Sequence, residues 1–319
     1  MTDTFRPEGE LLTTRTNCDL LSSQAGLERA MKNGETVEGI ATVCDGNMCL
    51  HVDLGCMRGI LPPEEAVYCR AGETRKDIAI VSRVGKAVAV KILAFTERNG
   101  ETVALLSRRA AQKECLERCL MRLRPGDLIP GRVTHMEPFG AFLDIGCGIA
   151  SLLSVDCISV SRISHPRDRL NVGMTLPVAV RSVDTGLERV CVTLRELLGT
   201  WSENAARFSA GQTVTGIIRS VESYGVFIEL TPNLAGLAEI RSEEHAAEMR
   251  TLIGKSVAVY IKNVIPERMK IKLVIIDTTP CHPSPRKLEF FVDPATTPHL
   301  DRWIYSPAGC GKLVETKFE

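Results

Sequence analysis

The sequence predicts a mainly β chain in which three tandem five-stranded barrels are joined by short helical connectors. Two observations predict this class. Three landmarks recur in the same order three times, which indicates an internal repeat, and apolar residues alternate within each repeat, which is the period of a half-buried strand. The landmarks are GETVEG, VDLG and VAVK at 34–39, 52–55 and 88–91, GDLIPG, LDIG and VAVR at 126–131, 143–146 and 178–181, and GQTVTG, IEL and VYIK at 211–216, 228–230 and 259–262.

The units of the chain follow from where the repeat pattern starts and stops. Residues 20–32 predict a helix that Asn33 and Gly34 end as a left-handed C-cap. Between repeats the apolar period becomes helical, near 108–123 and 195–208. The predicted units are an N-terminal extension with a helix at 1–33, a degenerate barrel at 34–109, a connector helix at 110–124, a barrel at 125–195, a connector helix at 196–209, a barrel at 210–277 and a C-terminal tail at 278–319.

Alternation places five short strands in each of the last two repeats. A longer connection separates the third strand from the fourth, and this spacing is typical of an OB-type barrel. The predicted strands lie near 127–136, 139–145, 149–154, 174–183 and 189–195 in the second repeat, and near 212–221, 224–230, 234–239, 256–265 and 268–275 in the third.

The tail begins with prolines and then becomes apolar. Its prolines are Pro280, Pro283 and Pro285, and its large apolar residues include Phe290, Phe291, Trp303 and Tyr305. Such a segment is too apolar for a disordered tail. We therefore expect it to dock in part onto the last barrel.

The composition narrows the classes of function. The formal net charge is +0, which argues against a protein that grips nucleic acid through a bulk positive field. The twelve cysteines contain no Cys-x-x-Cys pair, so we expect reduced, mostly buried thiols rather than zinc ligands, and no metal or cofactor. The chain has no leader and no apolar run near the roughly 18 residues of a membrane span, so we expect a soluble cytoplasmic protein without membrane contact.

Aromatic residues recur at one place in the second and third repeats. Phe139 and Phe142 flank a Gly-Ala pair, and Tyr224 and Phe227 flank a Gly-Val pair. An exposed ring offers a stacking partner for an unpaired base, and a glycine lets a nucleotide approach the backbone closely. Alternatively, one ring of each pair fills the barrel, because residues three apart on an ideal strand face opposite ways unless the strand bulges.

Basic residues accompany these rings. Arg181 and Lys262 end the fourth strands at equivalent positions. The fifth strands begin with or carry Arg189, Arg268, Lys270 and Lys272, and Arg162, Arg167 and Arg169 occupy the connection before the fourth strand of the second repeat. Cations beside stacking rings would follow a phosphate backbone. The alternative is that these residues merely keep an outer face and a turn solvated.

The run from Gly131 to Gly146 resembles the start of the ribosomal S1 RNA-binding domain, and residues 216–230 resemble it again. Residues 34–277 look like three tandem copies of that domain, and the whole chain is similar to the short ribosomal-protein-S1-like proteins of anaerobic Gram-positive bacteria. The resemblance implies an RNA-binding surface of two aromatics, a histidine on the third strand, and an Asp and Arg around the last hairpin.

Carried over by position, this surface is best kept in the second repeat. Ser154 replaces the histidine there, whereas in the third repeat Glu239 replaces it and Ile265 replaces the aspartate, so weaker or altered binding is expected. In the first repeat Met48 and His51 occupy the aromatic positions, beside an insertion at Asn47, so stacking is expected to be lost. The predicted RNA-binding residues are Phe139, Phe142, Arg181, Asp184, Arg189, Tyr224, Phe227, Lys262, Arg268 and Lys270.

These observations predict a non-catalytic protein that binds single-stranded RNA, with mRNA and the small ribosomal subunit as expected partners in translation, and a monomeric state. One alternative is a scaffold that docks on a ribosomal subunit or an RNA-processing enzyme, with RNA contact incidental. A second is a nuclease, but Asp53, Asp144 and Glu229 fall in separate repeats, whereas metal-dependent catalysis needs convergent carboxylates. His51, His135 and His165 each lack a second ligand at metal spacing, so we expect surface or capping roles for them.

Overall fold

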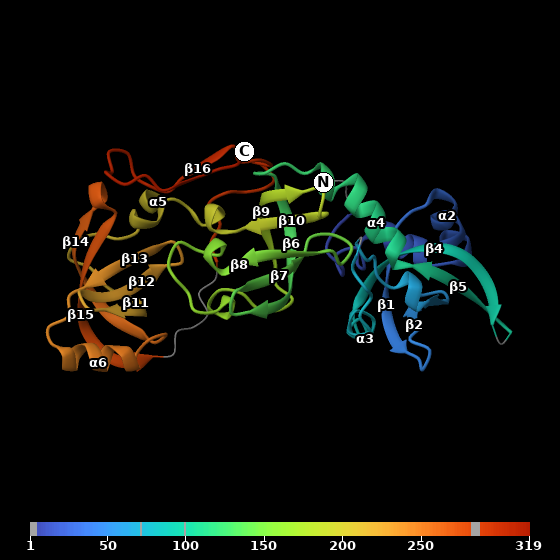
Figure 1. The fold of residues 1–319 in the computed structure, drawn as a ribbon, viewed down its shortest axis with the longest axis horizontal. Coiled ribbons are helices and arrows are strands. Elements are labelled where there is room, and N and C mark those ends of the chain that lie inside the picture. The colour runs from blue at the N-terminus through green and yellow to red at the C-terminus, as the bar shows by residue number, and fades with distance from the viewer. Residues whose placement is uncertain (1–4, 71, 99, 282–287) are drawn as a thin grey trace.

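The computed structural model describes residues 5–70, 72–98, 100–281 and 288–319. Three five-stranded sheets each close on themselves as a barrel, and Figure 1 shows them side by side in chain order. The prediction of a mainly β fold is confirmed. The first barrel contains β1 (Val37–Cys44), β2 (Leu50–Asp53), β3 (Arg58–Leu61), β4 (Ala87–Arg98) and β5 (Glu101–Ser107).

In the first barrel the strands neighbour each other in the order β1-β2-β3-β5-β4, and the second and third barrels have the equivalent order. Neighbouring strands are antiparallel except for the third and fifth strands of each barrel, which pair in parallel. The second contains β6 (Leu128–Glu137), β7 (Gly140–Asp144), β8 (Ala150–Ser154), β9 (Thr175–Asp184) and β10 (Arg189–Thr193). The third contains β11 (Thr213–Glu222), β12 (Gly225–Thr231), β13 (Leu234–Ala238), β14 (Ser256–Ile265) and β15 (Lys270–Cys281).

The helices differ more from the prediction than the strands do. The expected helix at 20–32 is two helices, α1 (Arg15–Leu21) and α2 (Gln24–Asn33), because the Ser23 hydroxyl accepts the Gly26 N–H and begins a new helix. Gly34 ends α2 at a φ of 65°, which confirms the predicted left-handed cap. The first barrel also carries α3 (Ile78–Val81), and the third carries α6 (Glu243–Thr251) between β13 and β14.

The two connectors are also broken. The first is α4 (Arg108–Arg118) followed by the 3-10 helix η2 (Leu120–Arg122), and the second is η5 (Arg195–Leu198) followed by α5 (Trp201–Ala205). Gly199, at a φ of 84°, separates η5 from α5. Thr200 then begins α5 with a capping box. A single helix over 195–208 is therefore wrong.

The tail packs against two barrels rather than one. Leu288 joins the core of the second barrel, whereas Trp303 and Tyr305 join the core of the third. The segment around His299 pairs with the residues just before β6, through a bridge from His299 to Asp127. In the same tail β16 (Arg302–Ile304) pairs with β17 (Glu315–Lys317). Figure 1 shows this red segment running along the second and third barrels. Pro283 and Pro285 lie outside the described residues.

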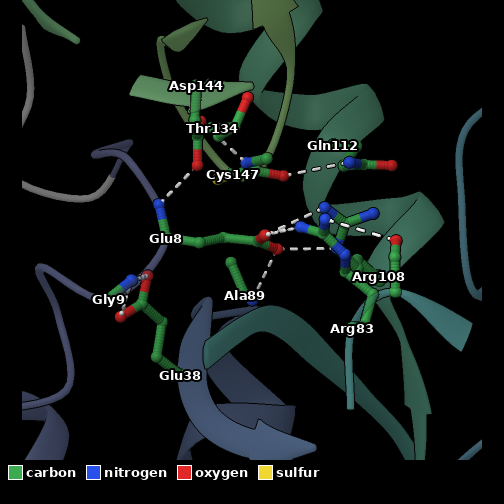
Figure 2. A network of polar contacts seen from close by, with 12 residues as sticks. Glu8, Gly9, Glu38, Arg83, Ala89, Arg108, Gln112, Thr134, Asp144 and Cys147 are labelled. Atoms are coloured by element: carbon green, nitrogen blue, oxygen red, sulfur yellow. Dashed lines mark hydrogen bonds and ion pairs between the residues drawn. The ribbon is translucent and has the colours of Figure 1, made fainter. Parts of the chain in front are cut away.

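A buried ionic cluster joins the first barrel to the second (Figure 2). Glu8 lies between them, with its carboxylate paired to Arg108 at 2.6 Å and 2.9 Å and to Arg83 at 3.4 Å. Its backbone N–H donates to Asp144 Oδ2 at 2.7 Å. Glu229 of the third barrel occupies the position that Asp144 has in the second barrel. It is also buried, and it accepts a hydrogen bond from Arg169 of the second barrel. Equivalent carboxylates therefore serve both junctions.

Acidification should stabilise the attachment of residues 9–12 to the first barrel. The Glu38 carboxyl accepts N–H bonds from Gly9, Leu11 and Leu12, but burial is the larger influence and raises its pKa from 4.5 to about 7. The folded state then holds a proton that the unfolded chain releases from about pH 4.5 upward, so the free energy of unfolding falls as the pH rises to 7, by on the order of 3 kcal/mol.

Denaturant titrations at pH 5 and pH 8 measure this difference. We expect the wild-type chain to be more stable at pH 5 and Glu38→Gln to show a smaller difference, because the amide does not titrate. Equal pH dependence in the two proteins would contradict this assignment.

Candidate nucleic-acid interface

The two ring pairs face outward with the same geometry in the second and third barrels. Phe139 is 56% exposed and Tyr224 is 64% exposed, and Phe142 and Phe227 are half-buried. In each pair the ring centroids are 6.0 Å apart and the ring planes meet at 88°. The four predicted aromatic residues thus form two equivalent edge-to-face platforms, and none of the four fills a barrel interior.

The need for a glycine inside each ring pair is explained by the packing of neighbouring strands. A Cβ on Gly140 would lie 2.5 Å from the carbonyl oxygen of Leu153, and one on Gly225 would lie 2.7 Å from that of Ala238. Both glycines are buried beneath the neighbouring strand. Glycine is therefore needed here for close packing of neighbouring strands.

The strand register places each half-buried ring in a row of outward residues. Side chains alternate between the two faces along a strand, so residues that pair across neighbouring strands point to the same face of the sheet. In the second barrel the row is His135, Phe142, Leu152, Cys191 and Ser182. In the third barrel it is Ser220, Phe227, Leu237, Lys272 and Asn263.

These rows contain two residues that the predicted site omitted. His135 stacks on Phe142, with centroids 6.2 Å apart and planes at 24°, and also contacts Glu137 at 2.6 Å. Lys272 is exposed and lies two strands from Phe227 in the same row. Their membership depends on cross-strand register, although the alternating Lys270-Ile-Lys272 pattern already marked Lys272 as outward.

The predicted cations lie around the rows. Arg181 and Lys262 each occupy the extra residue of a bulge in the fourth strand and are exposed. Asp184 pairs in register with Arg189, and Ile265 with Lys270, so Lys270 stands where Arg189 does. By strand alternation, Arg189 and Lys270 share the outer face of Cys191 and Lys272, two residues along.

Some of these cations already have partners. Arg181 donates to Cys157 Sγ at 2.9 Å, and Arg189 lies 3.7 Å from Glu73 of the first barrel. Arg268 is exposed beside Met269, which has a left-handed backbone. Lys262 and Lys272 line a pocket of about 310 Å³ together with Glu239.

The loop before β9 divides into exposed and buried arginines. Arg162 and Arg167 are exposed, but Arg169 is buried and paired with Glu229. Burial lowers the pKa of Arg169, while the charge of Glu229 raises it. The prediction that Arg169 contacts phosphate is wrong, because its guanidinium is buried and paired with Glu229 at the junction between the second and third barrels.

The first barrel has the same register without the rings. His51 occupies the place of Phe142 and Phe227, opposite Val43, and contacts Asp45 at 3.1 Å. Met48 has a φ of 62° in the preceding turn. Leu93, an exposed apolar residue, takes the bulge position of Arg181 and Lys262. No stacking pair or outward bulge cation is therefore offered here by the described residues.

Neither a cluster of metal ligands nor a membrane-spanning helix is found within the described ranges. No group of three or more His, Cys, Asp or Glu side chains there is placed to hold a metal ion. The cysteines described are free thiols. In the same ranges no helix is both long and apolar enough to cross a bilayer.

Comparison with known proteins gives matches over the second barrel and over most of the chain. The S1 RNA binding domain family matches residues 122–195. The small ribosomal subunit protein bS1 of Staphylococcus aureus (strain COL) is 26% identical over 282 residues, which cover 85% of this chain and 69% of that protein. The bS1 protein of Staphylococcus saprophyticus is 27% identical with the same coverage.

Solved structures give looser matches. GSP13 from Bacillus subtilis is 22% identical with a TM-score of 0.22, and the match covers 23% of this chain and 57% of that one. A multidomain protein with nucleic acid binding domains from Streptococcus pneumoniae is 15% identical with a TM-score of 0.24, over 77% of this chain and 74% of that one.

Proposed function

We propose that this chain, which is homologous to bacterial ribosomal protein bS1 over most of its length, binds single-stranded RNA without catalysing a reaction. The observation that carries the proposal is the pair of outward ring platforms, which have the same centroid distance and the same angle on the second and third barrels. Bases stack on such rings whatever their sequence, at about 1 to 3 kcal/mol per base.

Phosphate contacts complete the binding mode. The candidates are the exposed cations around the two rows: Arg181, Arg189, Lys262, Arg268, Lys270 and Lys272. A duplex would not expose its base faces to the rings, so unpaired RNA is the favoured ligand. Because both platforms belong to one chain, a strand that reaches both should bind with avidity.

The cellular setting that fits this activity is translation in the cytoplasm. The relatives carry the name of a small ribosomal subunit protein, and mRNA is the unpaired RNA that such a subunit handles. The first barrel, whose register position for stacking holds His51, is assigned a docking role toward the ribosome. Recruitment with incidental RNA contact becomes the better account if ring substitutions leave RNA affinity unchanged.

Salt dependence tests how much of the binding is electrostatic. With few phosphates neutralised by a chain of net charge +0, the slope of log affinity against log salt should be modest, at about −0.7 per phosphate on a single strand. Fluorescence anisotropy with a labelled RNA of about 30 nucleotides gives this slope. A slope steeper than about −6, which corresponds to more than about eight phosphates, would contradict stacking as the main contribution.

The carboxylates considered for catalysis do not converge. Asp53 accepts the Gly55 N–H in an exposed turn, whereas Asp144 and Glu229 are buried at different junctions. We therefore propose that none of the three assists cleavage. Incubating the purified chain with RNA and magnesium or manganese should leave the RNA intact, and cleavage that follows the protein through purification would overturn this part of the proposal.

A further inference from the structure

The ring platform of the third barrel lies in a pocket of about 420 Å³, a volume in the range of small-ligand sites. Tyr224, Phe227 and Met269 of the third barrel form one side of it. The other sides come from elsewhere: residues 160–162 of the second barrel, and Tyr305, Lys312 and Val314 of the tail. The pocket therefore exists only because three separate parts of the chain meet.

Hydrogen bonds attach the second-barrel loop and the tail to the third barrel. From the second barrel, the Ser161 N–H donates to the carbonyl of Pro232 at 3.1 Å and the Val160 N–H to Asn233 Oδ1 at 2.9 Å. From the tail, the Tyr305 hydroxyl donates to the carbonyl of Asn233 at 2.6 Å. Both walls thus attach to the same turn of the third barrel.

The tail loop that carries Lys312 is closed on itself. The Ser306 hydroxyl donates to the carbonyl of Lys312 at 2.7 Å and accepts the Val314 N–H at 2.7 Å. The Tyr305 N–H donates to the carbonyl of Val314 at 2.9 Å. This small ring of hydrogen bonds fixes the backbone at Lys312 beside the pocket while its side chain stays exposed.

The charges at the pocket favour an anion. Arg162 and Lys312 are exposed, and no ion pair or hydrogen bond of either side chain occurs among the described residues. Arg219 is already neutralised, at 2.6 Å from Glu229 and 3.3 Å from Asp168. Glu222 is the one carboxylate in the lining. Two uncommitted cations therefore face a single acid.

We propose that this pocket holds one unpaired nucleotide of the bound RNA, with its base against the Tyr224 and Phe227 rings and its phosphates contacted by Arg162 and Lys312. The proposal rests on the proposed function and adds a second-barrel loop and the tail to the binding site. Binding at the third barrel then requires the intact tail.

The pocket at the junction between the first and second barrels has a different lining. This pocket, of about 380 Å³, is lined by Thr134 and Asp144, which are equivalent to Arg219 and Glu229, but by no aromatic ring. Phe139 and Phe142 do not line that pocket, and Phe139 is 56% exposed. The two binding barrels should differ: one open face, and one pocket that limits how a nucleotide enters.

Tryptophan fluorescence reports on the third-barrel pocket specifically. The chain has two tryptophans. Trp201 lines the pocket, and the Trp303 ring lies beside that of the lining residue Tyr305, with centroids 5.5 Å apart and planes tilted by 40°. Titrating the full chain with a tetrauridylate, a length suited to one barrel, should change this fluorescence.

The test compares Arg162→Gln combined with Lys312→Gln against Lys113→Gln, an exposed lysine on α4. Loss of two phosphate contacts should make the salt slope shallower by about 1.4 and weaken binding by roughly tenfold or more at 0.1 M salt. The control should match the wild-type chain. Unchanged affinity and slope in the double variant would overturn the inference.

Ring substitutions separate this failure from failure of the proposed function. If Tyr224→Ala weakens binding while the cation variant does not, stacking stands and only the walls of the pocket are refuted. If Tyr224→Ala also binds as the wild type does, the third-barrel site is refuted altogether.

Discussion

Replacing Phe142 and Phe227 together by alanine should lower the affinity for single-stranded RNA by at least about 30-fold, because two stacked bases at about 1 kcal/mol or more each are lost. Each ring is half-buried in a row of outward residues on its own barrel. Each single substitution should give about half of the loss in free energy, since the rings lie on different barrels. Anisotropy with a labelled RNA of about 30 nucleotides measures the affinities.

Controls must separate stacking from folding. Phe290 is an exposed ring of the tail, 37% accessible, and Phe290→Ala should bind RNA as the wild type does. Phe139→Ala with Tyr224→Ala removes the more exposed ring of each pair, with little loss of packing, and should also weaken binding. Thermal melts of every variant are compared first. Wild-type affinity in both ring double variants would refute binding by stacking.

Arg108→Ala should destabilise the chain by about 3 kcal/mol, at the low end of the cost of breaking a buried ion pair, because Arg83 still lies near the Glu8 carboxylate. Arg108 is 3% exposed and grips the buried Glu8 with two hydrogen bonds (Figure 2). It also donates to the carbonyl of Ala66 at 3.3 Å. Loss of Arg108 therefore leaves Arg83 as the remaining ion-pair partner of Glu8.

The next residue supplies the matched control. Arg109 pairs with Glu65, but its side chain is 53% exposed, so Arg109→Ala should cost no more than about 1 kcal/mol. Urea titrations of both variants give the two free energies of unfolding. Equal losses would contradict the assignment of the first junction to the buried pair.

The same junction changes how truncations must be interpreted. Removing the first barrel would also remove Glu8, whose N–H binds Asp144 of the second barrel, and Phe5, which joins the core of the second barrel. Loss of RNA binding in such a deletion would then report damage to the second barrel. Point substitutions on exposed residues are the cleaner way to separate docking from RNA binding.

Strands and rings were predictable because their signals are local. Alternating apolar residues predicted β7 and β12 within one or two residues, and the Phe139 and Tyr224 positions follow from sequence spacing alone. The left-handed cap at Gly34 was predictable for the same reason. Helix breaks were missed where a single cap decides them, as at Ser23 and Thr200.

The rest depends on contacts between distant residues. Arg162 and Arg169 lie in the same polar loop, and nothing in the local sequence distinguishes them. Only the contact of Arg169 with Glu229, 60 residues away, shows that Arg169 is buried. Lys312 reaches the third-barrel pocket through a tail that crosses two barrels. His135 joins the site through its register with Phe142. The apolar pattern of a single segment does not predict such contacts between residues that are far apart in the sequence.

The most direct test of outward stacking is photocrosslinking of a 5-iodouridine-substituted RNA to the whole chain, followed by mass spectrometry of the adducts. Because this base couples to rings stacked on it, adducts should fall on Phe139, Phe142, Tyr224 and Phe227. Adducts confined to other peptides, with RNA affinity intact, would contradict the placement of unpaired bases on the second and third barrels.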